Sequence, residues 1–206
     1  MNAGPSVYYE PSPYRKAMGF HTFDPEKTDR LSDPTRFRFC SREELIEPLP
    51  ANQGARILDI GSGIGFYTDE LAPYFETVYA FDLQEEMHQQ YRNRGVPENV
   101  ELVTGDAGSL PFETETLDGA FSTMTFHEST TPESLSELAN TLTAGSPFVI
   151  VDWSGEGDGE AGPPLEERFS AAEANELLED AGFTVTRSAE RTETFVIVAH
   201  AVGSAE

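Results

Sequence analysis

Short apolar runs alternate along this chain with stretches in which apolar residues recur every three or four positions. Runs of this length predict strands, and the three-to-four spacing predicts amphipathic helices. The expected strands cover residues 56–60, 78–81, 100–103, 117–123 and 147–153. The expected helical faces carry Tyr67, Leu71, Tyr74 and Phe75, then Leu83, Met87 and Tyr91, and later Leu135, Leu138, Ala139 and Leu142. This alternation predicts a mainly parallel α/β sheet, covered on both faces, that binds ligands at the carboxyl ends of its strands.

Helix-capping sequences mark two further helix starts. Ser41 and Ser170 are each followed three residues later by Glu, and this capping box is typical of a helix N-terminus. The second of these helices has an apolar stripe that stops at Gly182, a suitable residue for a helix end. Two final runs, 183–188 and 194–201, are separated by a short polar turn. We expect them to form an antiparallel pair that closes the sheet.

The first 40 residues have a different composition, rich in Pro and aromatic residues and without a sustained period. They are too aromatic for a disordered tail. We expect residues 1–40 to form a lid and residues 41–206 to form one domain, since 206 residues suffice for a single core.

The chain has no apolar run of about 20 residues and no apolar leader, which predicts a soluble, cytoplasmic protein without membrane contact. Cys40 is the only cysteine, so the sequence predicts neither disulfides nor a structural zinc site.

The chain has 37 acidic and 13 basic residues, a formal net charge of -24, and its only lysines are Lys16 and Lys27. The carboxylates on such a surface repel each other, and concentrated salt weakens this repulsion by shortening the screening length. The charge therefore indicates adaptation to a salt-rich cytoplasm rather than an ordinary acidic protein. It also argues against a nucleic-acid partner, although this argument weakens in a saline cell in which nearly every protein is acidic.

The strongest chemical signal is the segment 57–65, ILDIGSGIG, in which an apolar strand leads into a glycine turn that opens a helix. Glycine permits backbone angles that a side chain forbids, and the N-terminus of the following helix offers free N–H groups to an anion. A second apolar run ends at Asp82, about twenty residues later, where a nucleotide-binding β-α-β unit places its ribose-binding carboxylate. Phe66 stands where a dinucleotide fingerprint has its third glycine, and Asp59 precedes the turn, so the pattern argues against a nicotinamide cofactor.

These motifs resemble those of the class I S-adenosylmethionine-dependent methyltransferases, and the resemblance extends over roughly residues 41–201. Residues 57–68 are similar to the first motif of that family, 105–107 with 110–112 to its adenine-binding segment, 117–122 to its fourth strand, and 138–153 to the following helix and strand. The pair Phe126-His127 is similar to one found in the ubiquinone and menaquinone biosynthesis branch. The resemblance implies a Rossmann-like, doubly wound sheet of seven strands with an antiparallel last strand, S-adenosylmethionine as cofactor, and a small-molecule acceptor.

The resemblance also implies roles for individual residues. The backbone of the glycine turn would pack on the methionine and ribose part of the cofactor, Asp59 would hold its amino end and Asp82 its ribose diol. Asp59 has an alternative role as a cap of the adjoining turn, Asp82 as a capping box with Glu85, and Asp106 as a turn residue. The expected cofactor-binding residues are Asp59, Gly61, Ser62, Gly63, Gly65, Asp82, Leu83 on the adenine face, Asp106 and Ala107 on the adenine edge, and Ser122 and Thr123 at the end of the fourth strand.

His127 is the candidate catalytic residue, because it follows the fourth strand and a neutral imidazole suits proton removal. The alternative is a hydrogen-bonded pocket histidine that takes no proton. We expect no metal, since Glu128 and Asp152 make only an incomplete set of the acids found in metal-dependent catechol methyltransferases. The Pro-Pro-Tyr signature of many amino-group methyltransferases is also missing. The acceptor and the oligomeric state stay open, and so does a non-catalytic module that binds the adenosyl ligand and regulates a partner.

Overall fold

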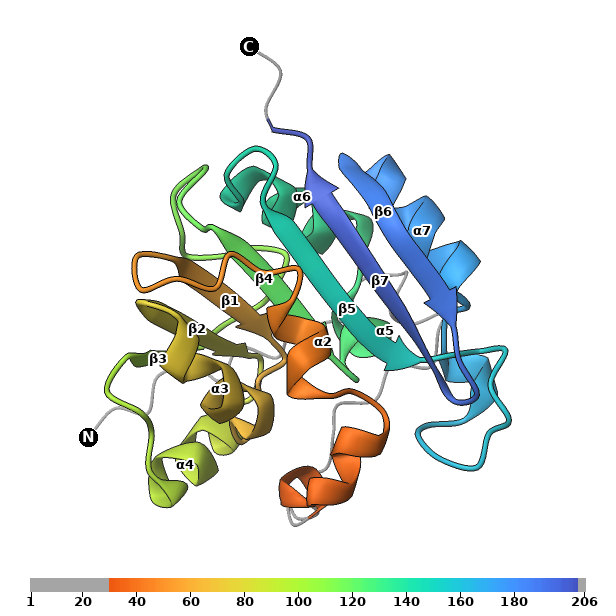
Figure 1. The fold of residues 1–206 in the computed structure, drawn as a ribbon, viewed down its shortest axis with the longest axis horizontal. Coiled ribbons are helices and arrows are strands. Elements are labelled where there is room, and N and C mark those ends of the chain that lie inside the picture. The colour runs from red at the N-terminus through yellow and green to blue at the C-terminus, as the bar shows by residue number, and fades with distance from the viewer. Residues whose placement is uncertain (1–29, 204–206) are drawn as a thin grey trace, which may run out of the picture.

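A seven-stranded sheet in the order β3-β2-β1-β4-β5-β7-β6 forms the centre of the computed structural model, which describes residues 30–203 (Figure 1). The strands β1 to β5 pair in parallel, whereas β7 runs antiparallel to both β5 and β6. The expected sheet of seven strands with an antiparallel last strand is therefore confirmed. The strands are β1 (Arg56–Ile60), β2 (Thr77–Asp82), β3 (Val100–Thr104), β4 (Gly119–Thr123), β5 (Pro147–Trp153), β6 (Phe183–Glu190) and β7 (Thr194–Ala201).

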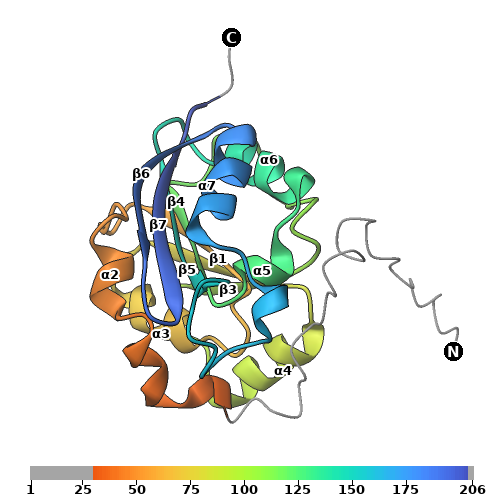
Figure 2. The same cartoon turned by 90° about the vertical axis from the view of Figure 1, so that its right-hand side faces the viewer.

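Helices cover the sheet on both faces. Figure 2 shows α2 and α3 on one side of the sheet and α6 and α7 on the other. The described helices are all too short to cross a bilayer. The α-helices are α2 (Arg42–Ile46), α3 (Phe66–Leu71), α4 (Glu85–Arg94), α5 (Phe126–Ser129), α6 (Pro132–Thr141) and α7 (Ala171–Asp180), and the 3-10 helices are η2 (Pro34–Arg38), η3 (Ala72–Tyr74) and η4 (Leu165–Glu167).

The alternation of side chains along each strand produces two apolar cores. In β5, Phe148 and Ile150 join a cluster with the apolar residues of α6 and α7, whereas Val149 and Val151 point to the opposite face. That second face packs against α2, α3 and Tyr91 of α4. Because both faces of the sheet are covered, its strands read in the sequence as continuous apolar runs rather than as an alternating pattern.

Most of the expected elements are confirmed, with differences at their ends. Ser41 and Ser170 form the expected capping boxes. The fourth strand begins at Gly119 rather than at Leu117, because Leu117 makes only an isolated bridge to Leu142. The last turn before β2 is a 3-10 helix rather than a continuation of α3, and it contains Pro73, which lacks the N–H that an α-helix requires.

The strand order reverses between β1 and β4, which are neighbours in space but not in sequence, and the connection from β3 to β4 carries the chain from one half of the sheet to the other. In open α/β sheets, ligands bind in the crevice outside the carboxyl ends of the strands at such a switch point. The glycine turn follows β1, and the segment with His127 follows β4. The topology therefore brings these two sequence motifs to the same crevice. Of the expected lid, residues 1–29 lie outside the described part.

Candidate active site

The glycine turn after β1 needs glycine at each of its three positions. Gly61, Gly63 and Gly65 have φ angles of +76°, +55° and +81°, a region that side chains rarely adopt. A Cβ atom on Gly61 would lie 2.1 Å from the side chain of Thr125, and one on Gly65 would lie 2.0 Å from the ring of Tyr91. At Gly63, in contrast, the nearest atom of the described residues other than its chain neighbours is Leu31 Cδ1, 3.6 Å from the Cβ position. Side chains therefore pack closely against the turn at Gly61 and Gly65, whereas the space beside Gly63 is open.

Asp82, at the end of β2, connects this turn to the next loop. Its Oδ2 accepts a 2.8 Å hydrogen bond from the Gly63 N–H, and its Oδ1 accepts one of 2.8 Å from the Gln84 N–H. Burial raises the pKa of Asp82, and these two N–H donors oppose the shift. The alternative capping box with Glu85 is wrong, because Gln84 is the N-cap of α4 and the Glu85 carboxylate bonds instead to Thr104 and Arg92.

Asp59, in β1, is fully buried on the side of the sheet that faces α3. Its Oδ2 accepts a 2.6 Å hydrogen bond from Thr68 Oγ1 in α3, and its Oδ1 has no hydrogen-bond partner among the described residues. The alternative that Asp59 caps the adjoining turn is therefore wrong. Burial raises the pKa of Asp59 to about 7, and the hydrogen bond from Thr68 opposes the shift. A buried carboxylate oxygen without a donor is costly, and it fits a site that receives a hydrogen-bond donor from a ligand.

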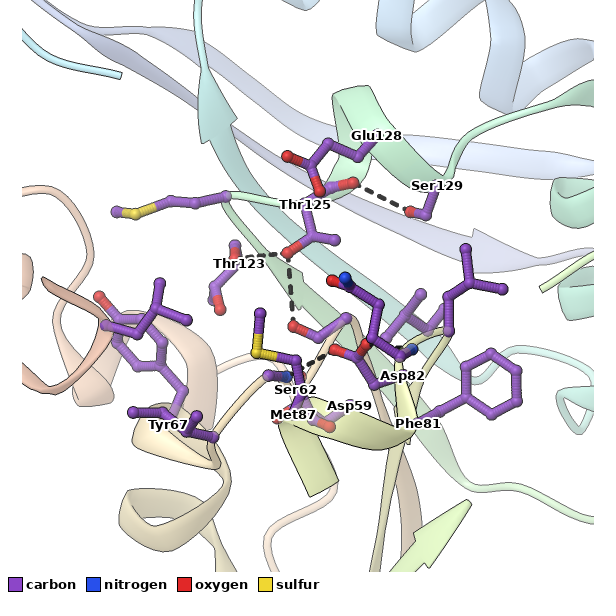
Figure 3. Close-up of a pocket in the computed structure, with 18 of the residues that line it drawn as sticks. Asp59, Ser62, Tyr67, Phe81, Asp82, Met87, Thr123, Thr125, Glu128 and Ser129 are labelled. Atoms are coloured by element: carbon purple, nitrogen blue, oxygen red, sulfur yellow. Dashed lines mark hydrogen bonds between the residues drawn. The ribbon is translucent and has the colours of Figure 1, made fainter. Parts of the chain in front are cut away.

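A pocket with about 930 Å³ of empty space, part of it open to solvent, lies over the turn (Figure 3). Ser62 lines the pocket, and its hydroxyl is buried and has no hydrogen-bond partner among the described residues. The pocket is lined by these residues predicted for the cofactor site: Asp59, Gly61, Ser62, Gly63, Asp82, Leu83, Ala107 and Thr123. Four predicted residues are not part of the lining: Gly65, Asp106, Ser122 and His127.

The adenine side of the expected site is formed by loops after β2 and β3. Leu83 is 40% exposed although it is apolar, and it lines the pocket. Ala107 and Gly105 line the pocket as well, whereas Asp106 between them accepts a 2.7 Å hydrogen bond from the Gly108 N–H. Asp106 is thus a turn residue, the alternative that the sequence left open, and the turn orients Gly105 and Ala107 toward the pocket.

Residues after β4 form the opposite wall of the pocket, and the sequence patterns gave no sign of most of them. Met124 has a φ angle of +58°, a strained conformation that concentrates at ligand sites. Thr125 Oγ1 donates to the Thr123 carbonyl at 3.1 Å and approaches the Gly61 carbonyl at 3.4 Å. These contacts fix the distance between the segment after β4 and the glycine turn. Other lining residues that the sequence analysis did not select include Arg36, Tyr67, Gln84, Met87, Glu128 and Ser129.

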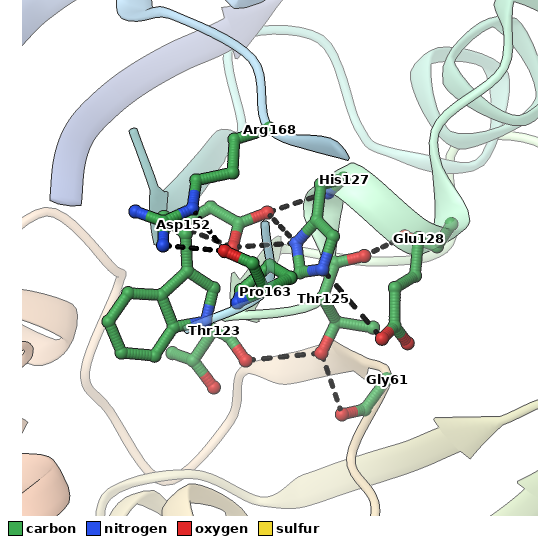
Figure 4. A network of polar contacts seen from close by, with 10 residues as sticks. Gly61, Thr123, Thr125, His127, Glu128, Asp152, Pro163 and Arg168 are labelled. Carbon is green, nitrogen blue, oxygen red and sulfur yellow. Dashed lines mark hydrogen bonds and ion pairs between the residues drawn. The ribbon is translucent and has the colours of Figure 1, made fainter. Parts of the chain in front are cut away.

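His127 lies beside this wall, between two carboxylates (Figure 4). Asp152 Oδ2 accepts a 2.6 Å hydrogen bond from the His127 backbone N–H and lies 2.9 Å from Nδ1 of its ring. Because a carboxylate only accepts, Nδ1 carries the hydrogen. The other ring nitrogen, Nε2, lies 3.7 Å from Glu128 Oε1. The His127 side chain is 6% exposed and that of Glu128 is 26% exposed, so Glu128 is the member of this group that reaches the pocket.

The three groups also determine each other's charge. Burial alone would lower the pKa of His127, but the Asp152 carboxylate, with a smaller effect of Glu128, raises it above its ordinary value. Burial raises the pKa of Glu128 to about 7, against the opposing effect of the nearby imidazole. A carboxyl group with a pKa near neutrality, at the wall of a pocket, is suited to accept a proton from a bound molecule.

The chain is similar to known methyltransferases in sequence and in fold. A family model described as a methyltransferase domain matches residues 58–150. The crystal structure of an S-adenosylmethionine-dependent methyltransferase from Aquifex aeolicus is 33% identical, with a TM-score of 0.80, and the match covers 88% of this chain and 100% of that one.

Curated proteins add similarity over part of their length. The biotin biosynthesis bifunctional protein BioHC of Cellvibrio japonicus is 36% identical over 52% of this chain and 22% of that protein. The demethylmenaquinone methyltransferase of Corynebacterium kroppenstedtii is 31% identical over 58% of this chain and 49% of that protein. The chain thus spans less than half the length of these curated relatives.

The pocket has the features that the cofactor of such enzymes requires. S-adenosylmethionine is an adenosine with a cationic sulfonium and an amino-acid end. The glycine turn leaves space for close approach of a ligand, Asp82 offers carboxylate oxygens, and Asp59 and Ser62 hold buried polar atoms without partners. With the fold, the site and the similarity to the Aquifex protein in agreement, the chain belongs to the class I S-adenosylmethionine-dependent methyltransferases, a family that implies S-adenosylmethionine as its cofactor.

Proposed function

We propose that this chain transfers the methyl group of S-adenosylmethionine to a small-molecule acceptor. The observation that carries the proposal is that one pocket joins the glycine turn and Asp82 to the wall after β4, which bears Glu128. The first side is suited to hold the donor, and the second provides a proton acceptor in α5, which follows a different strand. A pocket that bound only the adenosyl ligand would not need a carboxyl group on this wall. This favours an enzyme over the regulatory module.

The proposed donor site follows the roles implied by the sequence. The backbone at Gly61, Ser62 and Gly63 contacts the methionine and ribose part, and Asp59 receives the ammonium group. Asp82 accepts from the ribose hydroxyls, because each of its oxygens keeps a further lone pair beside its backbone bond. Leu83 and Ala107 contact the adenine, and Thr123 lines the pocket at the end of β4. Gly65, Asp106 and Ser122 lie outside the lining and shape the surrounding backbone.

Methyl transfer from a sulfonium is an in-line displacement, so the protein must align the acceptor atom and remove its proton where it carries one. The sequence assigned proton removal to His127. We assign the direct contact to Glu128, because Glu128 lines the pocket and the His127 ring does not. In this arrangement Asp152 orients His127, and the protonated imidazole stabilises the ionised form of Glu128. Residues 1–40 are proposed to cover the site, and Leu31 and Arg36 of this segment already line the pocket.

The acceptor is proposed to be a small molecule rather than a nucleic acid. The demethylmenaquinone methyltransferase among the relatives is named for a small-molecule acceptor. On the side after β4 the pocket wall combines an apolar side chain, Met124, with the single carboxyl group of Glu128. Such a wall suits an apolar molecule with one acidic hydroxyl or carbon, and it offers no cation for a phosphate backbone.

Calorimetric titration of the protein with S-adenosylmethionine in 2 M KCl tests the proposal, and we expect saturable binding. Gly63→Val should abolish it, because the new side chain would enter the open space in front of the turn. Gly145→Val is the matched control, since Gly145 also has a positive φ of +82° and none of the described residues comes within 4 Å of its Cβ position. Binding of NAD without binding of S-adenosylmethionine would contradict the proposal.

We also propose that the protein works in a salt-rich cytoplasm. Its melting temperature should then rise between 0.1 M and 2 M KCl, because the Debye length falls from about 10 Å to about 3 Å or less and the surface acids stop repelling each other. Differential scanning calorimetry measures this difference directly.

A surface variant controls for general effects of salt. Glu176, Glu179 and Asp180 are exposed acids in the second half of α7, where negative charge also opposes the helix dipole. The triple variant Glu176→Gln, Glu179→Gln, Asp180→Asn should melt higher than the wild type at 0.1 M KCl and gain less from added salt. A wild-type melting temperature that is equal or lower in 2 M KCl would argue against salt adaptation.

A further inference from the structure

Arg36 is the only basic residue among the described residues that line the pocket. The other charged groups of the lining are the carboxyl groups of Asp59, Asp82 and Glu128. S-adenosylmethionine carries two cationic groups, the sulfonium and the ammonium, and one anionic group, its carboxylate. The three acids are suited to the cations, and Arg36 is left as the complement of the single anion.

The fold holds Arg36 in place beside the glycine turn. The residue lies in the 3-10 helix η2, whose first N–H groups are capped by Asp33 through a 2.8 Å bond from the Thr35 N–H. The Tyr67 hydroxyl lies 3.2 Å from the Arg36 carbonyl and 3.0 Å from the Cys40 carbonyl, and it donates to this short stretch of backbone. Tyr67 belongs to α3, which directly follows the turn, so η2 is anchored to the same helix that positions Gly65.

The guanidinium of Arg36 is packed but has an unused donor. Its central carbon lies 5.3 Å from the centre of the Phe66 ring and 5.4 Å from that of Tyr67, distances that permit cation–π attraction. Its Nε is buried and has no hydrogen-bond partner among the described residues. Burial lowers the pKa of Arg36, yet a guanidinium stays protonated in proteins. The charge is thus partly desolvated, and no carboxylate of the described residues forms an ion pair with it.

Elsewhere this fold satisfies its less exposed guanidinium groups. The Arg168 side chain is 1% exposed, and it donates to the carbonyls of Pro163 and Ala161. Arg191 donates to the Glu44 carboxylate and to the Phe39 carbonyl. Leaving a charged donor unpaired is costly. The free donor of Arg36 at the wall of the pocket therefore indicates that its partner comes from the bound ligand.

We propose that Arg36 binds the carboxylate of S-adenosylmethionine and so fixes the amino-acid end of the donor against the glycine turn. This inference rests on the proposed function. The Asp59 carboxylate is close enough to Arg36 to interact with its charge, and Asp59 is the proposed partner of the ammonium group. Arg36 would bind the carboxylate and Asp59 the ammonium group, two groups of opposite charge that are bonded to the same carbon of the ligand.

The test compares two ligands that differ only in the carboxylate: S-adenosylmethionine and its decarboxylated form. For Arg36→Gln we expect the dissociation constant of S-adenosylmethionine to rise at least about tenfold, because a charge-assisted hydrogen bond to the carboxylate is lost. The affinity for the decarboxylated form should change by less than about threefold, since its binding never included that bond. Calorimetry in 2 M KCl measures all four constants.

Arg38→Gln is the matched control, because Arg38 lies in the same 3-10 helix but does not line the pocket. It should leave both affinities unchanged, and Arg36→Lys should restore part of the affinity for S-adenosylmethionine. Equal losses for both ligands in Arg36→Gln would overturn the inference and reduce Arg36 to a packing residue, as would no loss for either. Failure of the wild type to bind either ligand would instead count against the proposed function.

Discussion

Glu128→Gln is expected to lower the rate of methyl transfer by about 10²–10⁴-fold, the usual contribution of a general base. Glutamine has a similar shape but cannot accept a proton, and Glu128 is the carboxyl group at the pocket wall after β4. Donor affinity should change little, because Asp59, Asp82 and the glycine turn are untouched. The rate is measured as release of S-adenosylhomocysteine with an acceptor that the wild type methylates. Glu133→Gln, an exposed change in the first turn of α6, is the control.

The pH dependence of this rate distinguishes Glu128 from His127 as the base. Burial raises the pKa of Glu128 to about 7, and a base acts only when deprotonated. The wild-type rate should therefore increase with pH up to about 7 and level off above it. Glu128→Gln should lack this increase. His127→Gln removes a group that lowers the pKa of Glu128, so the increase should persist and move to higher pH.

The opposite result would return the catalytic role to the histidine. If His127→Gln abolished the pH-dependent increase and Glu128→Gln kept both the rate and the increase, the imidazole would be the base. A full rate in both variants, with the wild-type pH dependence, would mean that neither residue removes a proton during turnover. Asp152 is not a useful first target, because it binds the His127 backbone as well as its ring, and a variant would disturb both.

Asp82→Ala is expected to weaken binding of S-adenosylmethionine by about tenfold or more. A hydrogen bond to a charged acceptor contributes about 1.5–3 kcal/mol, and 1.4 kcal/mol corresponds to a factor of ten. The structure adds a second reason for the loss. The Asp82 carboxylate accepts from the Gly63 N–H at 2.8 Å, so its removal also frees the middle of the glycine turn. Titration calorimetry measures the change.

Asp118→Ala controls for the loss of an aspartate that accepts from backbone. Asp118 Oδ2 accepts a 2.8 Å hydrogen bond from the Arg56 N–H at the opposite end of β1, far from the turn. The two variants thus remove similar bonds at the two ends of one strand. If Asp82→Ala folds and binds the donor with unchanged affinity, its carboxylate serves only the local backbone and the proposed ribose contact is wrong.

The sequence by itself determined the order of the elements. Strands of the parallel sheet are buried on both faces, so each one is a short apolar run that stands out against the helical spacing between runs. The capping boxes at Ser41 and Ser170 involve residues three positions apart, and local hydrogen bonds are enough to form them. The glycine turn could be predicted for the same reason, because the positive φ at Gly61, Gly63 and Gly65 strongly favours glycine at each position.

Only the tertiary structure decided which side chains share the pocket. Arg36 and Glu128 are separated by about ninety residues, and no local pattern distinguishes them from the other charges of a chain with 37 acidic residues. His127 was selected because it follows the fourth strand and a neutral imidazole suits proton removal, yet its ring turns toward Asp152, on a neighbouring strand, and leaves the wall to Glu128. Which carboxylates are ionised likewise depends on burial and on neighbours brought together by the pairing of β1 with β4. Sequence thus specifies short-range backbone requirements, whereas the placement and charge of the site depend on contacts between segments that are far apart in the chain.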